Sequence, residues 1–159
     1  ITGSTLTLKV VSGPSIGTVF MKTPGQPLTI GRVPTNNLVL NDPEVSGKHA
    51  SIKWNSKVNL GLTFNAVYFK LNNLLHFSHI QSLVWELVDL GSLNGTHVNN
   101  ESVPFDRSRG EAKRKHSIPI GLETGDILLL GSTSQILVSY SSVFLGLSVS
   151  FSHSKKKLA

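Results

Sequence analysis

Short runs of alternating apolar and polar residues recur along the chain and predict β-strands. In the first run, Leu6, Leu8 and Val10 alternate with polar residues before Gly13 and Pro14. A period of two is typical of a strand with one buried face. Such runs, separated by clusters of Gly, Pro, Asn, Asp and Ser, lie at residues 4–13, 18–22, 27–31, 37–41, 50–54, 83–90, 126–131 and 135–140. Many short strands with polar turns favour an all-β sandwich or barrel.

Residues 58–82 interrupt this pattern between two runs that suit the strands of one hairpin. Lys70 is their only charged residue. Hairpin loops usually have about two to five residues, so we predict an insertion here. The segment is rich in Phe, Leu, Asn and Val, as translated T-rich intron sequence often is, so a retained intron is one interpretation. An amphipathic helix is another interpretation, because five apolar residues follow helical spacing. They are Phe64, Val67, Tyr68, Leu71 and Leu75.

The chain is expected to form one domain over residues 1–142, followed by an apolar and basic tail over residues 143–159. The apolar part of the tail is shorter than the roughly 20 residues that span a bilayer, so we predict no transmembrane segment. A final strand or a loose end is the simplest interpretation, and a basic anchor at a membrane surface is the alternative.

Asn94 and Gly95 form a dipeptide that strongly indicates a tight hairpin turn, because such turns need positive φ at both central residues. Asn94 also begins an N-glycosylation acceptor, as does Asn100. The chain has no cysteine, so it has no disulfide framework and nothing in it requires an oxidising compartment. The first residues do not resemble a secretory signal. We therefore expect both acceptors to stay unmodified.

Charge narrows the choice of partner. Lys and Arg number 15 against 9 Asp and Glu, and the net charge of +6 favours an anionic partner. Residues 107–116 and Lys155–Lys157 concentrate much of the positive charge. A basic nucleic-acid-binding β domain is therefore the alternative function. However, no aromatic residues are interleaved for base stacking and no nucleic-acid-binding motif occurs, so we do not expect nucleic acid as the partner.

Three polar loops that flank predicted strands carry the candidate chemistry. Arg32 offers a permanently charged, planar donor group for an oxyanion. Ser46 offers a hydroxyl, and the backbone amides near Gly47 and Lys48 offer further donors. Asn94 can donate and accept at once, as contact with a peptide backbone requires. A sandwich can gather such loops at one end, which would place a phosphate site beside a peptide-binding side chain.

The ordered motifs in these loops resemble those of the forkhead-associated (FHA) domain, a phosphothreonine-binding module. They are GRV at Gly31, VSGKHA around Ser46 and His49, and GSLNGT around Asn94 and Gly95. Together with WELVD and DILLLG, they are similar to the FHA domains of plant phosphatases that dock on phosphorylated receptor-like kinases. The resemblance implies a β-sandwich of two antiparallel sheets, with the insertion in one hairpin as a departure from it.

The resemblance also implies roles for single residues. Arg32 and Ser46 would contact the phosphate, Asn94 would hold the ligand backbone, and Gly47 and Lys48 would add donors. The roles of Gly31, His49 and Gly95 would be to shape the loops. Gly47 and Leu93 stand where some members carry Asn and Thr or Ser, which predicts fewer ligand contacts.

Two chemical alternatives are weaker. Ser46 and His49 do not form a hydrolase site, because no Gly-x-Ser-x-Gly elbow occurs and their separation does not make a triad. His76 and His79 have no further metal ligands nearby in the sequence. We therefore predict a non-catalytic binding module that needs no cofactor and no metal.

The resemblance implies phosphothreonine-containing proteins, above all the cytoplasmic domains of kinases, as partners. We expect a monomer in the cytoplasm that a kinase partner recruits to the plasma membrane, with the nucleus as the alternative location.

Overall fold

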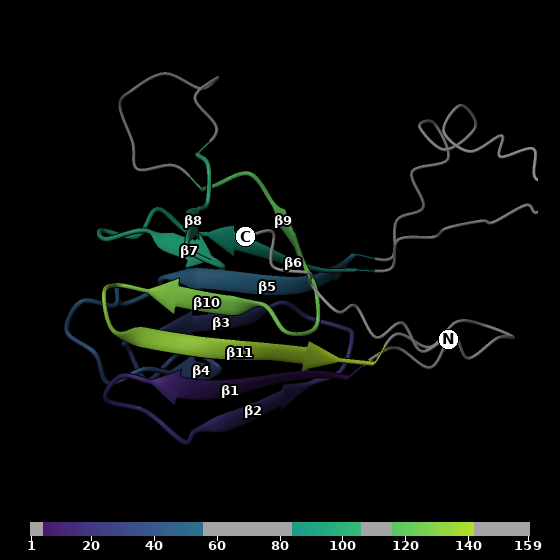
Figure 1. The fold of residues 1–159 in the computed structure, drawn as a ribbon, viewed down its shortest axis with the longest axis horizontal. Coiled ribbons are helices and arrows are strands. Elements are labelled where there is room, and N and C mark those ends of the chain that lie inside the picture. Colours follow the sequence, from purple (N-terminus) through teal and green to yellow (C-terminus); the bar gives the residue numbers. More distant parts are fainter. Residues whose placement is uncertain (1–4, 56–83, 106–115, 142–159) are drawn as a thin grey trace, which may run out of the picture.

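The described residues of the chain form two β-sheets. The computed structural model describes residues 5–55, 84–105 and 116–141, and these residues contain strands and turns but no helix. The six-stranded sheet has the order β2 (Val19–Lys22), β1 (Leu6–Ser12), β11 (Ser134–Tyr140), β10 (Ile127–Leu130), β7 (Thr96–Val98) and β8 (Glu101–Ser102). The five-stranded sheet has the order β4 (Leu38–Val39), β3 (Leu28–Gly31), β5 (Ala50–Asn55), β6 (Val84–Asp89) and β9 (Ile120–Leu122). Figure 1 shows β11 between β1 and β10.

The two sheets share one apolar core, which the alternation along each strand creates. Leu6, Leu8 and Val10 are fully buried on β1, as their spacing predicts. Leu87 on β6 of the five-stranded sheet and Leu128 on β10 of the six-stranded sheet are also fully buried, and both belong to this core. The predicted all-β sandwich is confirmed. Its pairings are antiparallel except for β3 with β4, which is parallel.

The tight hairpin turn lies at a different place from the one predicted. Asn94 and Gly95 are in the connection between β6 of one sheet and β7 of the other, so they do not join a hairpin. Gly95 has a φ of 79°. The two-residue hairpin turn is Asn99–Asn100, between the paired strands β7 and β8, with φ values of 50° and 69°. Asparagine tolerates this left-handed backbone conformation better than other non-glycine residues, which explains the position.

The strands β5 and β6 are paired as the sequence predicts. Their register runs from Ala50 opposite Asp89 to Asn55 opposite Val84. The proposed insertion at residues 58–82, with His76 and His79, lies outside the described residues and remains a prediction, and the same holds for the tail. The basic clusters also lie outside them, except for His116. Among the described residues no helix is long and apolar enough to cross a membrane.

Truncation of Leu128 tests the core. Leu128 is fully buried, whereas Met21 on β2 is 65% exposed. We expect Leu128→Ala to lower the free energy of unfolding by about 2–5 kcal/mol, because it removes buried apolar contacts and leaves a cavity. Met21→Ala, the matched control, should change it by less than about 0.5 kcal/mol. Urea denaturation of both variants measures the difference, and equal losses would contradict the assignment of the core.

Candidate functional site

The loops after β3 and before β5 lie side by side. The amide of Arg32 donates to the carbonyl oxygen of Ser46 (3.0 Å), and the amide of Val33 donates to that of Gly47 (3.2 Å). The side chain of Arg32 is exposed. Within the described part of the chain, its guanidinium has no carboxylate within salt-bridge distance and no hydrogen-bond acceptor. Arg32 thus presents an unpaired cation next to the Ser46 loop.

Gly31 is required by this close approach. A Cβ atom at Gly31 would lie 2.3 Å from the carbonyl oxygen of Gly47 and 2.8 Å from Nδ2 of Asn36. That Asn36 amide group donates to the carbonyls of Val33 (2.8 Å) and Gly47 (2.6 Å), so it joins the same two loops. Sequence reasoning found Gly31 but missed Asn36, which the motif comparison gave no reason to select.

Ser46 and His49 connect this pair of loops to the β6–β7 connection. The amide of Ser46 donates to Nδ1 of His49 (3.1 Å), and Nε2 of His49 lies 3.0 Å from the carbonyl oxygen of Gly95. Because Nδ1 accepts, the ring proton belongs on Nε2, which donates to Gly95. The hydroxyl oxygen of Ser46 accepts a hydrogen bond from the amide of Leu93 (2.9 Å). Its O–H has no acceptor among the described residues and can donate to a ligand.

His49 is held in its neutral form. Its side chain is fully buried, and this burial lowers its pKa below the ordinary value of 6.5. The carbonyl of Gly95 and the carboxylates of Asp89 and Asp42 act in the opposite direction but do not overcome burial. A second proton on the ring would place a donor against the amide of Ser46, so the neutral ring is the one that fits the loops.

Asp89 gives the β6–β7 connection its shape, and sequence reasoning missed it. Its buried carboxylate accepts from the amides of Gly91 (2.8 Å) and Ser92 (2.7 Å) through Oδ1. Oδ2 accepts from the hydroxyls of Ser92 and Thr96, both at 2.6 Å. The Asp–x–Gly spacing at the end of a predicted strand is a turn signal that could have identified it.

A second buried aspartate anchors the loop between β4 and β5. Oδ2 of Asp42 accepts from the hydroxyls of Thr133 (2.9 Å) and Ser134 (2.6 Å) at the β10–β11 turn. Its Oδ1 accepts from the amide of Glu44 (2.9 Å). Burial acts to raise the pKa of Asp42, but the hydrogen bonds from Ser134, Glu44 and Thr133 outweigh it and keep the pKa below its ordinary value. Thr133 and Ser134 lie about 90 positions from Asp42 in the sequence, so no local pattern indicated these two contacts.

Asn94 is fixed on the same loop. Its Nδ2 donates to the carbonyl oxygen of Glu44 (2.8 Å), and the Glu44 carboxylate accepts from the amide and the hydroxyl of Ser132. The side chain of Asn94 is exposed, so its amide oxygen and second N–H face solvent beside this anchor. Lys48 is also exposed, within the loop that joins Ser46 to His49.

The structure therefore brings the three predicted loops together, through Arg32 to Ser46, Ser46 to Leu93, and His49 to Gly95. The polar groups that these loops leave accessible are the cations of Arg32 and Lys48, the hydroxyl of Ser46 and the side-chain amide of Asn94. Such groups suit an anion attached to a peptide. In the described residues, no group of three His, Cys, Asp or Glu side chains could hold a metal ion.

Comparison with known proteins gives matches over most of the chain. The model of the FHA domain family matches residues 28–131. Protein phosphatase 2C 70 of Arabidopsis thaliana is 38% identical over 143 residues, which are 87% of this chain and 20% of that protein. The chain thus spans about a fifth of the length of this relative.

Solved structures show the same similarity. The kinase-interacting FHA domain of kinase associated protein phosphatase from Arabidopsis has 35% identity and a TM-score of 0.64, and the match covers 91% of this chain and all of that one. The FHA domain of an Arabidopsis thaliana hypothetical protein has 27% identity and a TM-score of 0.59, over 94% and 92% of the two chains. The resemblance identified from the sequence motifs is thereby confirmed.

Alanine at Gly31 tests the close approach of the loops. We expect Gly31→Ala to lower the free energy of unfolding by about 1–3 kcal/mol or more, because its Cβ would collide with backbone. Gly47→Ala is the matched control, since its Cβ would meet only the end of the Val33 side chain at 3.2 Å. Thermal unfolding of the two variants compares them. A Gly31 variant as stable as the Gly47 variant would contradict the described contact.

Acid pH should weaken the fold through His49. The unfolded chain takes up this proton near pH 6.5, whereas the folded protein resists it. The stabilisation is therefore complete above pH 6.5 and is lost as pH falls through the lower pKa of the folded state. The contribution of Asp42 is lost only at lower pH, below 3.8. Urea unfolding of the wild type and of His49→Gln between pH 7.5 and about 4.5 isolates the histidine, since the variant should lose less stability over this interval.

Proposed function

The chain belongs to the FHA domain family, and from that premise we propose that it is a phosphothreonine-dependent protein-binding module that docks on phosphorylated kinases. The observation that carries the proposal is the unpaired guanidinium of Arg32 beside the Ser46 loop, in which the hydroxyl of Ser46 can still donate. A phosphothreonine carries a charge of about −1.5 to −2 and three strong acceptor oxygens. Arg32 supplies the opposite charge and Ser46 supplies a donor.

The neighbouring side chains suit the peptide around that phosphate. Asn94 is held by Glu44 and keeps one donor and one acceptor facing solvent, the pair needed to bind a peptide backbone. Lys48 adds a second positive charge that favours the phosphate, and the amide of Gly47 lies in the same loop. These groups are preorganised by His49, Asp89 and Asp42, so binding requires little ordering of the loops.

The proposed partners are the cytoplasmic domains of receptor-like kinases. One similar solved structure is a kinase-interacting FHA domain, and a relative that matches 87% of this chain is a plant protein phosphatase. The phosphatase activity belongs to that longer protein. For the residues of this chain we propose binding without catalysis, in the cytoplasm and at the plasma membrane where such a kinase recruits the protein.

Replacement of Arg32 tests the site. Charge-assisted hydrogen bonds contribute about 1.5–3 kcal/mol, so Arg32→Ala should weaken binding of a phosphothreonine peptide at least about tenfold. The measurement is calorimetric titration with a peptide from a receptor-like kinase, beside its unphosphorylated and phosphoserine forms. We expect no binding of the unphosphorylated peptide and weaker binding of phosphoserine.

Lys53→Ala is the matched control for this titration. It also removes one positive charge, but from the exposed face of β5 and not from the loops. The affinity of this variant for the phosphothreonine peptide should stay within about twofold of that of the wild type, because long-range charge alone contributes little at physiological salt. An equal loss in both variants would show a general charge effect. Binding of the folded protein to none of a diverse set of phosphothreonine peptides would overturn the proposal.

A further inference from the structure

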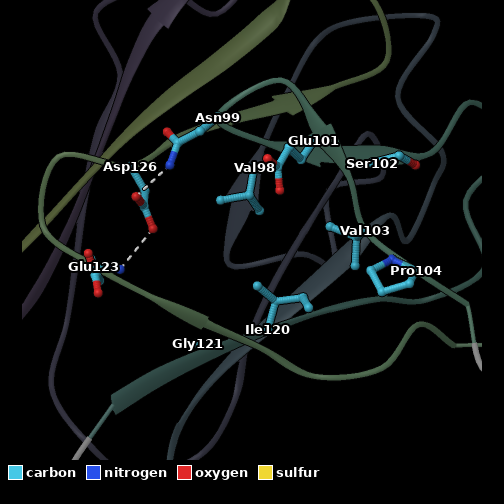
Figure 2. A pocket seen from close by; sticks show the side chains of 10 residues that line it. All are labelled: Val98, Asn99, Glu101, Ser102, Val103, Pro104, Ile120, Gly121, Glu123 and Asp126. Atoms are coloured by element: carbon cyan, nitrogen blue, oxygen red, sulfur yellow. Dashed lines mark hydrogen bonds between the residues drawn. The ribbon is translucent and has the colours of Figure 1, made fainter. Parts of the chain in front are cut away.

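A cleft of about 410 Å³ lies at the open edge of the sandwich. Its lining residues come from the β7–β8 hairpin of the six-stranded sheet and from β9 of the five-stranded sheet, with the connections next to them (Figure 2). Both β8 and β9 are edge strands. Its volume falls in the range of roughly 300–1,000 Å³ that is typical of ligand sites. The residues proposed to bind phosphopeptide do not line it.

The floor of the cleft is apolar. Val103 is 3% exposed, and Val98 and Ile120 are half-buried, with their side chains directed into the space between the hairpin and β9 in Figure 2. Val103 itself belongs to the core, so an aliphatic chain in the cleft would cover mainly the exposed parts of Val98 and Ile120.

The rim of the cleft is acidic. Glu101, Glu123 and Asp126 are the charged side chains among its described lining, which includes neither lysine nor arginine. Glu101 and Glu123 are exposed, and in the part of the chain that the structure describes neither carboxylate has an ion-pair partner. Within the described lining, the rim is therefore negatively charged, although the whole chain has a net charge of +6.

The wall of the cleft is rigid. Both oxygens of the Asp126 carboxylate accept hydrogen bonds, from Nδ2 of Asn99 (2.7 Å) and from the amide of Glu123 (2.8 Å). The amide oxygen of Asn99 in turn accepts from the amide of Ile127 (3.0 Å). These bonds fix the hairpin turn and the start of β10 relative to each other, so the cleft is preformed and Asp126 needs no further partner.

We propose that this cleft is a second docking site, which binds an arginine or lysine side chain of a partner protein. The aliphatic stem of such a side chain would cover Val98 and Ile120, and its cationic head would pair with Glu101 and Glu123. Charge complementarity selects this occupant, because a neutral apolar group would leave both carboxylates unpaired and an anion would be repelled. The site requires no phosphate and is separate from the loops that carry Arg32.

The test is an NMR titration of the ¹⁵N-labelled full chain with two unphosphorylated peptides. They are acetyl-Gly-Leu-Arg-Leu-Gly-amide and the same peptide with citrulline, which keeps the shape of arginine but lacks its charge. We expect the arginine peptide to shift the amide resonances of Val98, Glu101, Ile120 and Glu123 in a saturable manner. The citrulline peptide should bind at least about tenfold more weakly.

Two variants complete the test. Glu101→Gln/Glu123→Gln removes both rim charges with little change of shape and should reduce binding of the arginine peptide at least about tenfold. Thr23→Lys/Gln26→Lys changes the net charge by the same amount, at exposed positions after β2 on the opposite edge of the six-stranded sheet, and should bind like the wild type. Arg32→Ala should also bind like the wild type, so the outcome does not depend on the phosphopeptide site. No saturable shifts around the cleft, equal shifts with citrulline, or unchanged binding in the glutamine variant would overturn the proposal.

Discussion

The carboxylate of Asp89 is fully buried, and the loop that crosses from one sheet to the other depends on it. It accepts hydrogen bonds from two amides and two hydroxyls within residues 91–96, and its Oδ2 lies 3.8 Å from Nε2 of His49. A buried charge is costly unless hydrogen bonds satisfy it, so the loop is constrained to the conformation that supplies all four donors. His49 extends the same cluster to Ser46 and Gly95. The three loops of the proposed site therefore take their positions from buried polar groups that are not exposed at the surface.

Buried and exposed polar groups have different tasks at this site. His49, Asp42 and Asp89 are buried and hydrogen-bonded. Arg32, Lys48 and Asn94 are exposed, and within the described residues the two cations have no carboxylate partner. A surface cation costs little when unpaired because water solvates it, whereas an unpaired buried group would destabilise the fold. In the proposed site, anion binding is thus assigned to side chains that can be unpaired in the free protein, on loops held by hydrogen bonds.

The strand pattern and the three loops were predictable from the sequence, and the network beneath them was not. Alternation located β1 and β11, because each strand has one buried face with a period of two. The strands β7, β8 and β9 were missed, and each has only two or three residues, whereas β4, with two, lies within the longer predicted run at residues 37–41. Asn94–Gly95 was interpreted as a hairpin because local turn chemistry does not reveal that β6 and β7 belong to different sheets. Asp42 binds side chains about 90 positions away, a contact that only the fold creates.

The register of β5 and β6 separates the three loops from the points at which residues 56–83 join these two strands. Ala50 and Asp89 are paired at the end that continues into His49 and the β6–β7 connection, whereas Asn55 and Val84 are paired at the other end. Five steps of about 3.4 Å separate the two ends, a distance of roughly 17 Å. Trp54 and Trp85 pack edge to face beside the far end, with ring centroids 5.2 Å apart. Asn55 and Val84 thus lie at the end of the paired strands remote from the loops, next to a packed aromatic pair, and the hydrogen bonds described for the three loops join residues at the opposite end.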